Sequence, residues 1–524
     1  MKSRAFFADN NLIIDGAPFF IRGGEIQYFR MPKPQWSDRL EKAAKGGLNT
    51  VTSYMPWYFH EYEEGKFDFS GETLPERDIR EFLRLAQELK LKVIARPGPY
   101  VNSELRFGGL PEWLCRNHPE VVSHRADGNI VTGTACPAEG ETVYRNYVRK
   151  WIEKIAPVIA EFQISKGGPV IMFQPDNELS AAWSYGLFNS LYDSETIGIR
   201  WPDWLKKKYG NIEDLNRNYP EMNYTDFGQV QVPRSFPKDD TGKELAMDWL
   251  DFKRNFFADW GAVMCEWAME LGIEIPFVFN EPVAGFYGHG DHSGFGSAIK
   301  ERDIQAVTAC HTYSDRILDL EGVQNMLLGI ELVKASPLDG SAISIEANAL
   351  WYMPRLSRTD LNWNILMRFG LGHGLDGQVI YPYTAHTVDL KDVIEGPEYF
   401  EPGCIGIDGE LSPSYHILKD YFAFVESWEK EICTSSVKPE LAIVYTPGMR
   451  YLDFLGAPPL VQKQGGNIDG NSRIGGEKFD AEPTIDRGQA AFGHDWTDGY
   501  EGVSKQTVKA ESGIWRKFKE AMLL

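Results

Sequence analysis

The chain has 524 residues, which exceeds one ordinary domain and fits a large barrel with a smaller appendage. Its formal net charge is −21, and an acidic surface repels phosphate backbones and anionic lipids, so we expect neither nucleic-acid nor membrane partners. No segment approaches 18 uninterrupted apolar residues, and the first residues lack the apolar run of a signal peptide. The six cysteines are scattered without a Cys-x-x-Cys pair, which predicts reduced thiols and a cytoplasmic protein.

The aromatic content, with 15 Trp, 23 Tyr and 30 Phe, is high for this length. Aromatic faces stack on the C–H surfaces of sugars, but most aromatic side chains in any protein belong to its core. Composition alone therefore favours core packing over carbohydrate binding.

In chain order, the first 180 residues alternate between short apolar runs and segments with helical spacing. The segment 36–45 has helical composition and stops at Gly46-Gly47, and the apolar positions from 79 to 89 recur at helical spacing. Apolar runs continue to about residue 381 and give eight expected strands: 19–24, 48–54, 91–95, 170–173, 276–279, 307–312, 342–345 and 378–381. The alternation predicts an α/β fold with a parallel sheet.

A closed (β/α)8 barrel is favoured over an open sheet, because eight strands each run into polar or aromatic residues and no Gly-x-Gly-x-x-Gly or Walker loop follows any of them. We expect the barrel to occupy residues 1–430, with a helical and loop insertion at about 183–255. A smaller α/β domain is expected at 431–524, opening with a strand at 438–445 and possessing a Gly- and Asp-rich loop.

Two glutamates stand at strand ends, where barrel enzymes place their chemistry. The fourth strand runs into Asn177-Glu178, and the seventh ends at Glu346. Taken singly, the first pair is as consistent with a helix cap and the second with a structural salt bridge. Taken together, they can face each other across the barrel mouth, as the two carboxyl groups of a retaining glycosidase must. Glu281 and Glu331 are weaker candidates.

The N-terminal 180 residues resemble glycoside hydrolase family 35, the β-galactosidase family. The matching segments are 24–30, 47–51, Trp57 with His60-Glu61, 67–71, Arg96-Pro97-Gly98-Pro99-Tyr100 with Glu104, 107–114 and Gly167-Gly168-Pro169 leading to Asn177-Glu178. The segments 204–210 and 251–254 are instead similar to family 42, a related barrel family that also contains β-galactosidases.

The resemblance implies site residues as well as a fold. It makes Glu178 the acid/base and a strand-7 glutamate the nucleophile, for which Glu346 is the best match. It also implies that Tyr28, Glu104 and Asn177 touch the sugar. For Tyr28 the alternative is a packed aromatic, and for Glu104 it is an ion pair with an arginine such as Arg106.

Trp351 and Tyr381, near the ends of strands seven and eight, are the expected sugar platforms, with ordinary core packing as their alternative. The chain departs from the family pattern at Gln27, at Tyr58, at Asn102-Ser103 and at Leu179-Ser180. These changes surround expected sugar-recognition positions and leave Glu178 intact, so the chemistry transfers better than the substrate.

No cofactor and no metal is expected, because the ten histidines form no His-Glu-x-x-His motif. His289 and His292 lie in a Gly-rich loop that we interpret as a mobile rim of the active site. The leading hypothesis is a retaining, exo-acting β-glycosidase, most simply a β-galactosidase, acting on a β-linked glycoside or oligosaccharide. The alternatives are a β-glucoside- or β-glucosaminide-active hydrolase, a transglycosylase, and a non-catalytic carbohydrate-binding barrel. The second domain suggests a homo-oligomer, a dimer or a trimer.

Overall fold

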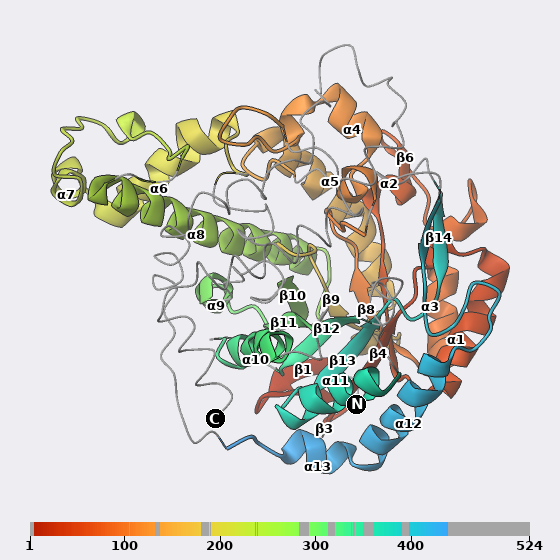
Figure 1. Ribbon diagram of the computed structural model, residues 1–524. Helices are drawn as coiled ribbons and strands as arrows, with labels where there is room; N and C mark the ends of the chain where they lie inside the picture. The colour runs from red at the N-terminus through yellow and green to blue at the C-terminus, as the bar shows by residue number, and fades with distance from the viewer. Residues whose placement is uncertain are drawn as a thin grey trace.

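The computed structural model describes residues 5–438, except for 104, 131–136, 180–187, 189, 236, 238, 282–292, 313–319, 337, 339–340, 349–359 and 390–397. Within these ranges the main feature is a closed barrel of eight parallel strands (Figure 1). In order around the barrel these are β4 (Ile21–Glu25), β5 (Thr50–Tyr54), β8 (Lys92–Arg96), β9 (Val170–Phe173), β10 (Phe277–Glu281), β11 (Ala306–Thr312), β12 (Ile343–Asn348) and β13 (Gly377–Tyr381). The (β/α)8 prediction is confirmed, and each strand falls on one of the eight apolar runs.

The barrel closes between its last strand and its first, where β13 pairs with β4 in parallel. Glycines make this close approach feasible. A Cβ on Gly23 would lie 2.7 Å from Val379, and one on Gly24 would lie 2.7 Å from the ring of Tyr383. The Arg22 guanidinium strengthens the closure from outside, since it binds Glu429 at 2.6 Å.

The barrel strands alternate with helices that bury one apolar face each. The helices around the barrel are α1 (Trp36–Lys45), α2 (Trp57–His60), α3 (Ile79–Glu88), α4 (Glu112–Asn117), α5 (Thr142–Glu161), α9 (Ser293–Lys300), α10 (Leu320–Lys334), α11 (Asp360–Gly372), α12 (Pro413–Ser427) and α13 (Glu429–Thr434). Helix α3 illustrates the local cause. The Asp78 side chain caps its first turn by accepting from the Glu81 N–H, and its apolar positions face the core.

The segment between β9 and β10 is helical in most of its described part. It contains α6 (Trp201–Tyr209), α7 (Ile212–Asn218) and the long α8 (Asp240–Glu270). In Figure 1 these helices extend to one side above the barrel, with α7 farthest out and the end of α8 returning to pack on α5 and α9. Asp248 ties the insertion together, because it accepts hydrogen bonds from Lys208 and Tyr209, each at 2.6 Å.

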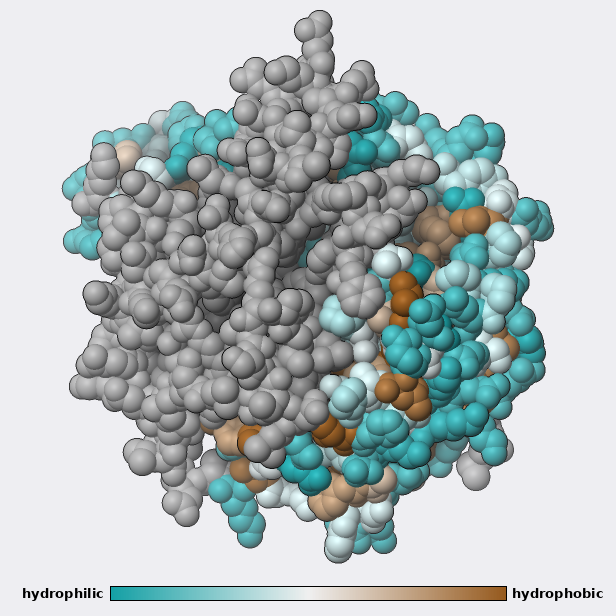
Figure 2. Space-filling model, turned by 45° about the vertical axis from the view of Figure 1, so that its right-hand side comes forward, coloured by the Kyte–Doolittle hydropathy of each residue, from teal (hydrophilic) through white to brown (hydrophobic). Residues whose placement is uncertain are grey.

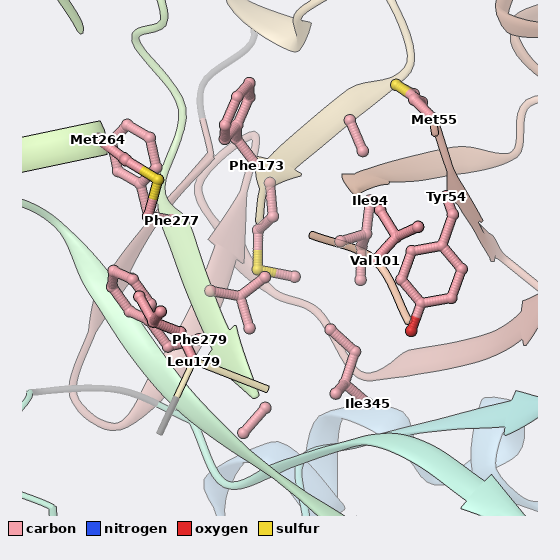
Figure 3. Close-up of a cluster of buried hydrophobic side chains, with 14 of the residues drawn as sticks. Tyr54, Met55, Ile94, Val101, Phe173, Leu179, Met264, Phe277, Phe279 and Ile345 are labelled. Atoms are coloured by element: carbon pink, nitrogen blue, oxygen red, sulfur yellow. The ribbon is translucent and has the colours of Figure 1, made fainter. Parts of the chain in front are cut away.

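Buried apolar side chains of the barrel strands pack together. Figure 3 shows one such cluster, with Ile94, Phe173, Phe279 and Ile345 among its members, together with Tyr54. Five cysteines in the described part of the chain are buried and free, including Cys115 and Cys310.

Short antiparallel strands complete the fold: β1 (Ala5–Ala8), β2 (Asn11–Ile14) and β3 (Ala17–Pro18), then β6 (Glu61–Glu63) with β7 (Lys66–Phe67), and β14 (His386–Asp389) with β15 (Glu398–Glu401). On the face shown in Figure 2, the described surface is mainly hydrophilic, with apolar residues in small separate patches. No helix in the described ranges has the length and apolar content to cross a bilayer. The expected strand at 438–445 and almost all of the expected second domain lie outside the described residues.

Candidate active site

The C-terminal ends of the barrel strands bring a set of buried polar side chains together. They come from seven strands or the loops just after them: Glu25, Tyr54, Arg96, Asn177, Glu178, Asn280, His311 and Glu346. All of them are buried. A buried polar group must find partners, so the contacts within this set define what each side chain can do.

Glu346 lies on β12 and is surrounded by donors. Its Oε1 accepts from the Arg96 guanidinium, lies 3.0 Å from the Tyr54 hydroxyl and 3.4 Å from the Asn280 amide nitrogen. The same Tyr54 hydroxyl is also 3.0 Å from Asn177 Oδ1, and its single proton serves one acceptor at a time. Donors and a cation around a buried carboxylate favour its ionised form.

Arg96 is the cation of the site and links two carboxylates. It binds Glu25 Oε2 at 2.6 Å with one nitrogen and contacts Glu346 with the other, while its guanidinium lies 4.0 Å from the centre of the Tyr54 ring. Burial alone would lower the pKa of Arg96, but Glu25, Tyr54 and Glu346 raise it well above its usual value. Burial raises the pKa of Glu25 to about 7, the Arg96 charge opposes this rise and the Glu346 charge adds to it.

Glu178 follows β9 in a turn that the surrounding polar groups fix. Its φ is +52°, in the left-handed region that costs a non-glycine residue about 1 kcal/mol. The Glu178 N–H donates to Asn280 Oδ1 at 2.8 Å, and the Asn177 N–H donates to the Tyr100 carbonyl at 3.1 Å. Asp176 Oδ1 accepts from the Tyr100 N–H at 3.1 Å, so the loops after β8 and β9 hold each other. The strained residue is thus the one that carries the candidate acid/base.

His311 lies between the two glutamates, at the end of β11. Its Nδ1 is 3.3 Å from Glu178 Oε1, and its Nε2 is 3.7 Å from Glu346 Oε2 and 2.9 Å from the Asn280 amide nitrogen. Burial lowers the pKa of His311 to about 4; the Glu346 charge opposes this shift and the Arg96 charge adds to it. The ring is therefore neutral at neutral pH.

The spacing of these groups limits the chemistry. One donor atom each of Glu178, His311 and Glu346 lies within 4.8 Å of the others. Three such donors could reach a single cation, but Arg96 already supplies a positive charge to Glu346 and would repel one. This upper limit on the distance between one oxygen of each glutamate is compatible with the carboxyl pair of a retaining glycosidase, whose carboxyl groups are about 5–5.5 Å apart.

Of the other expected site residues, Asn177, Tyr28 and Tyr381 lie in the described part of the chain. Asn177 joins the site, where its Oδ1 accepts from Arg96 at 2.8 Å and its Nδ2 donates to the Val101 carbonyl at 3.1 Å. Tyr28 packs instead in a fully buried aromatic cluster and contacts His60 through its hydroxyl. The described contacts of Tyr28 are those of a packed aromatic, which was the alternative to a sugar contact. Tyr381 is buried at the end of β13. Sugar contacts by these residues stay predictions.

Several other expectations can be placed or set aside. Glu104, Trp351, His289 and His292 lie outside the described residues. Glu331 is on α10 and pairs with Lys334 at 2.8 Å on the surface, away from the strand ends. Glu281 is the last residue of β10, and its backbone pairs with Cys310 of β11.

Gln27, one of the departures from the family pattern, turns out to be buried beneath the site. It donates to Glu25 and accepts from the Tyr54 N–H at 3.2 Å. The glutamine at this position therefore supplies a hydrogen bond to the buried Glu25 carboxylate.

Five members of the site were not expected from the sequence: Glu25, Tyr54, Arg96, Asn280 and His311. Each stands at or next to the last residue of a predicted strand, and Arg96 opens the most specific of the quoted motifs. These residues could have been found in the sequence as polar residues at the end of a buried strand, the same feature by which Glu346 was predicted.

A closed (β/α)8 barrel with two buried glutamates, one just after β9 and one on β12, is the arrangement found in barrel glycoside hydrolases. Residues 11–266, just under half of the chain, match the profile of glycosyl hydrolases family 35. The match includes Glu25, Arg96, Asn177 and Glu178 and ends before Asn280, His311 and Glu346.

Proteins that are similar to this chain carry different activities in their names. An exo-beta-D-glucosaminidase of Pyrococcus horikoshii is 38% identical over 46% of this chain and 31% of its own length. A beta-1,2-glucosyltransferase of Ignavibacterium album is 30% identical over 54% of this chain and 38% of its own length. A mouse (Mus musculus) beta-galactosidase is 37% identical over 33% of this chain and 24% of its own length. The chain thus spans about a third of the length of the curated relatives it matches.

Solved structures extend the fold match beyond the family segment. A beta-galactosidase from Rahnella sp. R3 superposes with a TM-score of 0.67 at 15% identity, covering 87% of this chain and 62% of that one. A catalytic mutant of a family 42 beta-galactosidase from G. stearothermophilus gives a TM-score of 0.64 at 18% identity, covering 83% of this chain and 60% of that one. At these identities the likeness concerns the fold.

Proposed function

We propose that the protein is a retaining β-glycosidase in which Glu346 is the nucleophile and Glu178 the acid/base. The observation that carries the proposal is the pair of buried carboxylates after β9 and on β12, with one oxygen of each within 4.8 Å. That separation leaves room for the sugar's anomeric carbon and not for an extra water between carboxylate and carbon, as an inverting mechanism would need.

The surroundings of the two glutamates divide their roles. Arg96 and the Tyr54 hydroxyl face Glu346, and these donors keep it ionised as a nucleophile must be. Glu178 faces the neutral ring of His311, so it has a weaker preference for the ionised form and can hold a proton.

In the first step, a Glu346 oxygen forms a bond to the anomeric carbon while the bond from that carbon to the leaving oxygen breaks. The Glu178 proton passes to the leaving oxygen. In the second step, Glu178 removes a proton from water, the water oxygen attacks the anomeric carbon and the bond to Glu346 breaks. Two displacements at one carbon leave the sugar with its original configuration.

For the donor sugar we keep β-galactoside as the first candidate, because residues 11–266 match family 35 and the relatives of the chain include named beta-galactosidases. A β-glucosaminide or β-glucoside is the second candidate. It is favoured by the longer matches to an exo-beta-D-glucosaminidase and a beta-1,2-glucosyltransferase. The latter name also keeps transfer to a second sugar as a variant of the same mechanism. Cytoplasmic location and assembly into a dimer or trimer remain predictions from the sequence.

The test is sugar release from aryl β-glycosides carrying galactose, glucose or glucosamine. One donor should be turned over clearly faster than the others, and Glu346→Gln should lower that turnover by about 10⁴-fold or more. Glu331→Gln is the matched control, since this surface glutamate should leave turnover unchanged. Binding of a sugar without turnover by the wild-type protein would instead favour the non-catalytic barrel.

A further inference from the structure

Glu178, Asn280 and His311 are buried and contact one another in a closed loop. Asn280 accepts from the Glu178 N–H, His311 contacts Asn280, and His311 Nδ1 returns to within 3.3 Å of Glu178 Oε1. Asn280 and His311 sit near the ends of the adjacent strands β10 and β11. Each of these contacts fixes the orientation of the next.

The Asn280 amide has only one orientation that fits its neighbours. Its Oδ1 lies 2.8 Å from the Glu178 backbone N–H, which can only donate, so this atom must be the amide oxygen. Gln174 Nε2 also donates to Asn280 Oδ1 at 2.8 Å, and Gln174 is itself oriented by donating to the Asp176 carbonyl. The amide nitrogen of Asn280 consequently faces His311.

That orientation determines the tautomer of His311. The ring nitrogen Nε2 is 2.9 Å from the Asn280 Nδ2 donor, so Nε2 must accept. A neutral imidazole carries its one proton on the other nitrogen, here Nδ1. The ring is neutral at neutral pH because burial lowers the pKa of His311 to about 4.

We propose that His311 is a positioning residue that donates from Nδ1 to Glu178 Oε1 and thereby confines the acid proton of Glu178 to Oε2. The proposal rests on Glu178 being the acid/base. In the first step the Oε2–H bond breaks, the proton goes to the leaving oxygen, and its electron pair stays on Glu178. A carboxyl group with two equivalent oxygens would hold the proton on the wrong one for part of the time, and the His311 donor removes that alternative.

The role is tested by the leaving group, because only poor leaving groups need the acid proton. We would measure kcat/KM for aryl β-glycosides of the preferred sugar, from dinitrophenyl to methoxyphenyl. His311→Leu should lose about 30-fold or more on the methoxyphenyl glycoside and less than about 3-fold on the dinitrophenyl glycoside. An equal loss on both would mean a structural role and would overturn the proposal.

Two variants separate the hydrogen bond from the packing of the ring. His311→Asn places an amide N–H near the position of Nδ1 and should recover most of the activity on the methoxyphenyl glycoside. His60→Leu is the matched control, since His60 is also fully buried and its pKa is also lowered by burial to about 4, but it contacts Tyr28 and the Asp68 carbonyl. Any loss in His60→Leu should be independent of the leaving group.

The reference for all variants is Glu178→Ala. If Glu178→Ala shows the leaving-group dependence and His311→Leu does not, the His311 role is wrong and the acid/base assignment stands. If Glu178→Ala turns over the methoxyphenyl glycoside normally, the proposed function itself fails.

If His311→Leu does not fold, Asn280→Asp provides the same test with His311 in place. An acceptor opposite Nε2 draws the ring proton to that nitrogen and takes it from Nδ1. The same loss on poor leaving groups should follow, and its absence would overturn the proposal.

Discussion

Glu178 and Glu346 carry the same functional group, but the two sides of the barrel mouth give them different partners. On the side of β4, β5 and β8, Glu346 meets a guanidinium and a hydroxyl. On the side of β10 and β11, the Glu178 carboxyl group faces a neutral imidazole, and the Glu178 backbone N–H donates to the Asn280 amide oxygen. Side-chain identity cannot assign a nucleophile and an acid, whereas the charge of the neighbours can.

The largest effect on activity and stability should come from removing the Arg96 charge beside Glu346. Arg96→Met removes the positive charge between Glu25 and Glu346 and leaves two buried carboxylates without compensation. We expect kcat/KM to fall at least about 100-fold and the free energy of unfolding to fall by about 3–5 kcal/mol. Urea denaturation and turnover of the preferred aryl glycoside measure the two effects.

The double variant Arg96→Met with Glu25→Gln is the control for that prediction. It removes one of the two uncompensated carboxylates, so it should be more stable than Arg96→Met alone. Equal stability of the single and double variants would show that Glu25 and Arg96 are not coupled as their contact implies.

A smaller loss should follow removal of the Tyr54 hydroxyl. Tyr54→Phe keeps the ring under the Arg96 guanidinium and deletes one donor to Glu346. A hydrogen bond to a charged group contributes about 1.5–3 kcal/mol, so kcat/KM should fall about 10- to 100-fold. Activity unchanged by Tyr54→Phe would mean that Arg96 alone supports the nucleophile.

Glu25, on the same side of the barrel mouth as Arg96, should make the folding stability depend on pH. Burial raises the pKa of Glu25 to about 7 from an unfolded value of 4.5, so the folded protein binds the extra proton between these pH values. Folding stability should therefore fall as pH rises from about 4.5 to about 7, by up to a few kcal/mol. Glu25→Gln should lack this part of the decline. Identical pH profiles of the two proteins would contradict the raised pKa.

Part of this contrast was visible in the sequence. Eight apolar runs predicted the eight barrel strands, and Glu346 was found because an acid closes one of them. Helix α1 spans the segment expected from its composition and from the Gly46-Gly47 stop. These features are local, so periodicity and end signals report them.

The partners of the two glutamates were not visible in the same way. Arg96 and His311 are each far from Glu346 along the chain, and only barrel closure and strand register bring them together, as when His311 pairs with Glu346 across β11 and β12. For Tyr28 the sequence left a sugar contact and a packed aromatic open, and the side chain packs among aromatic rings and contacts His60. Which face of a strand end a side chain takes depends on the assembled fold.

The most direct measurement is chemical rescue of Glu178→Ala by azide on an aryl glycoside with a good leaving group. Without azide, the glycosyl-enzyme on Glu346 should accumulate, because no base activates water. Azide needs no such base, so turnover should rise with azide concentration and yield the β-glycosyl azide. No rescue, or formation of the α-glycosyl azide, would contradict the assignment of Glu178 as acid/base and Glu346 as nucleophile.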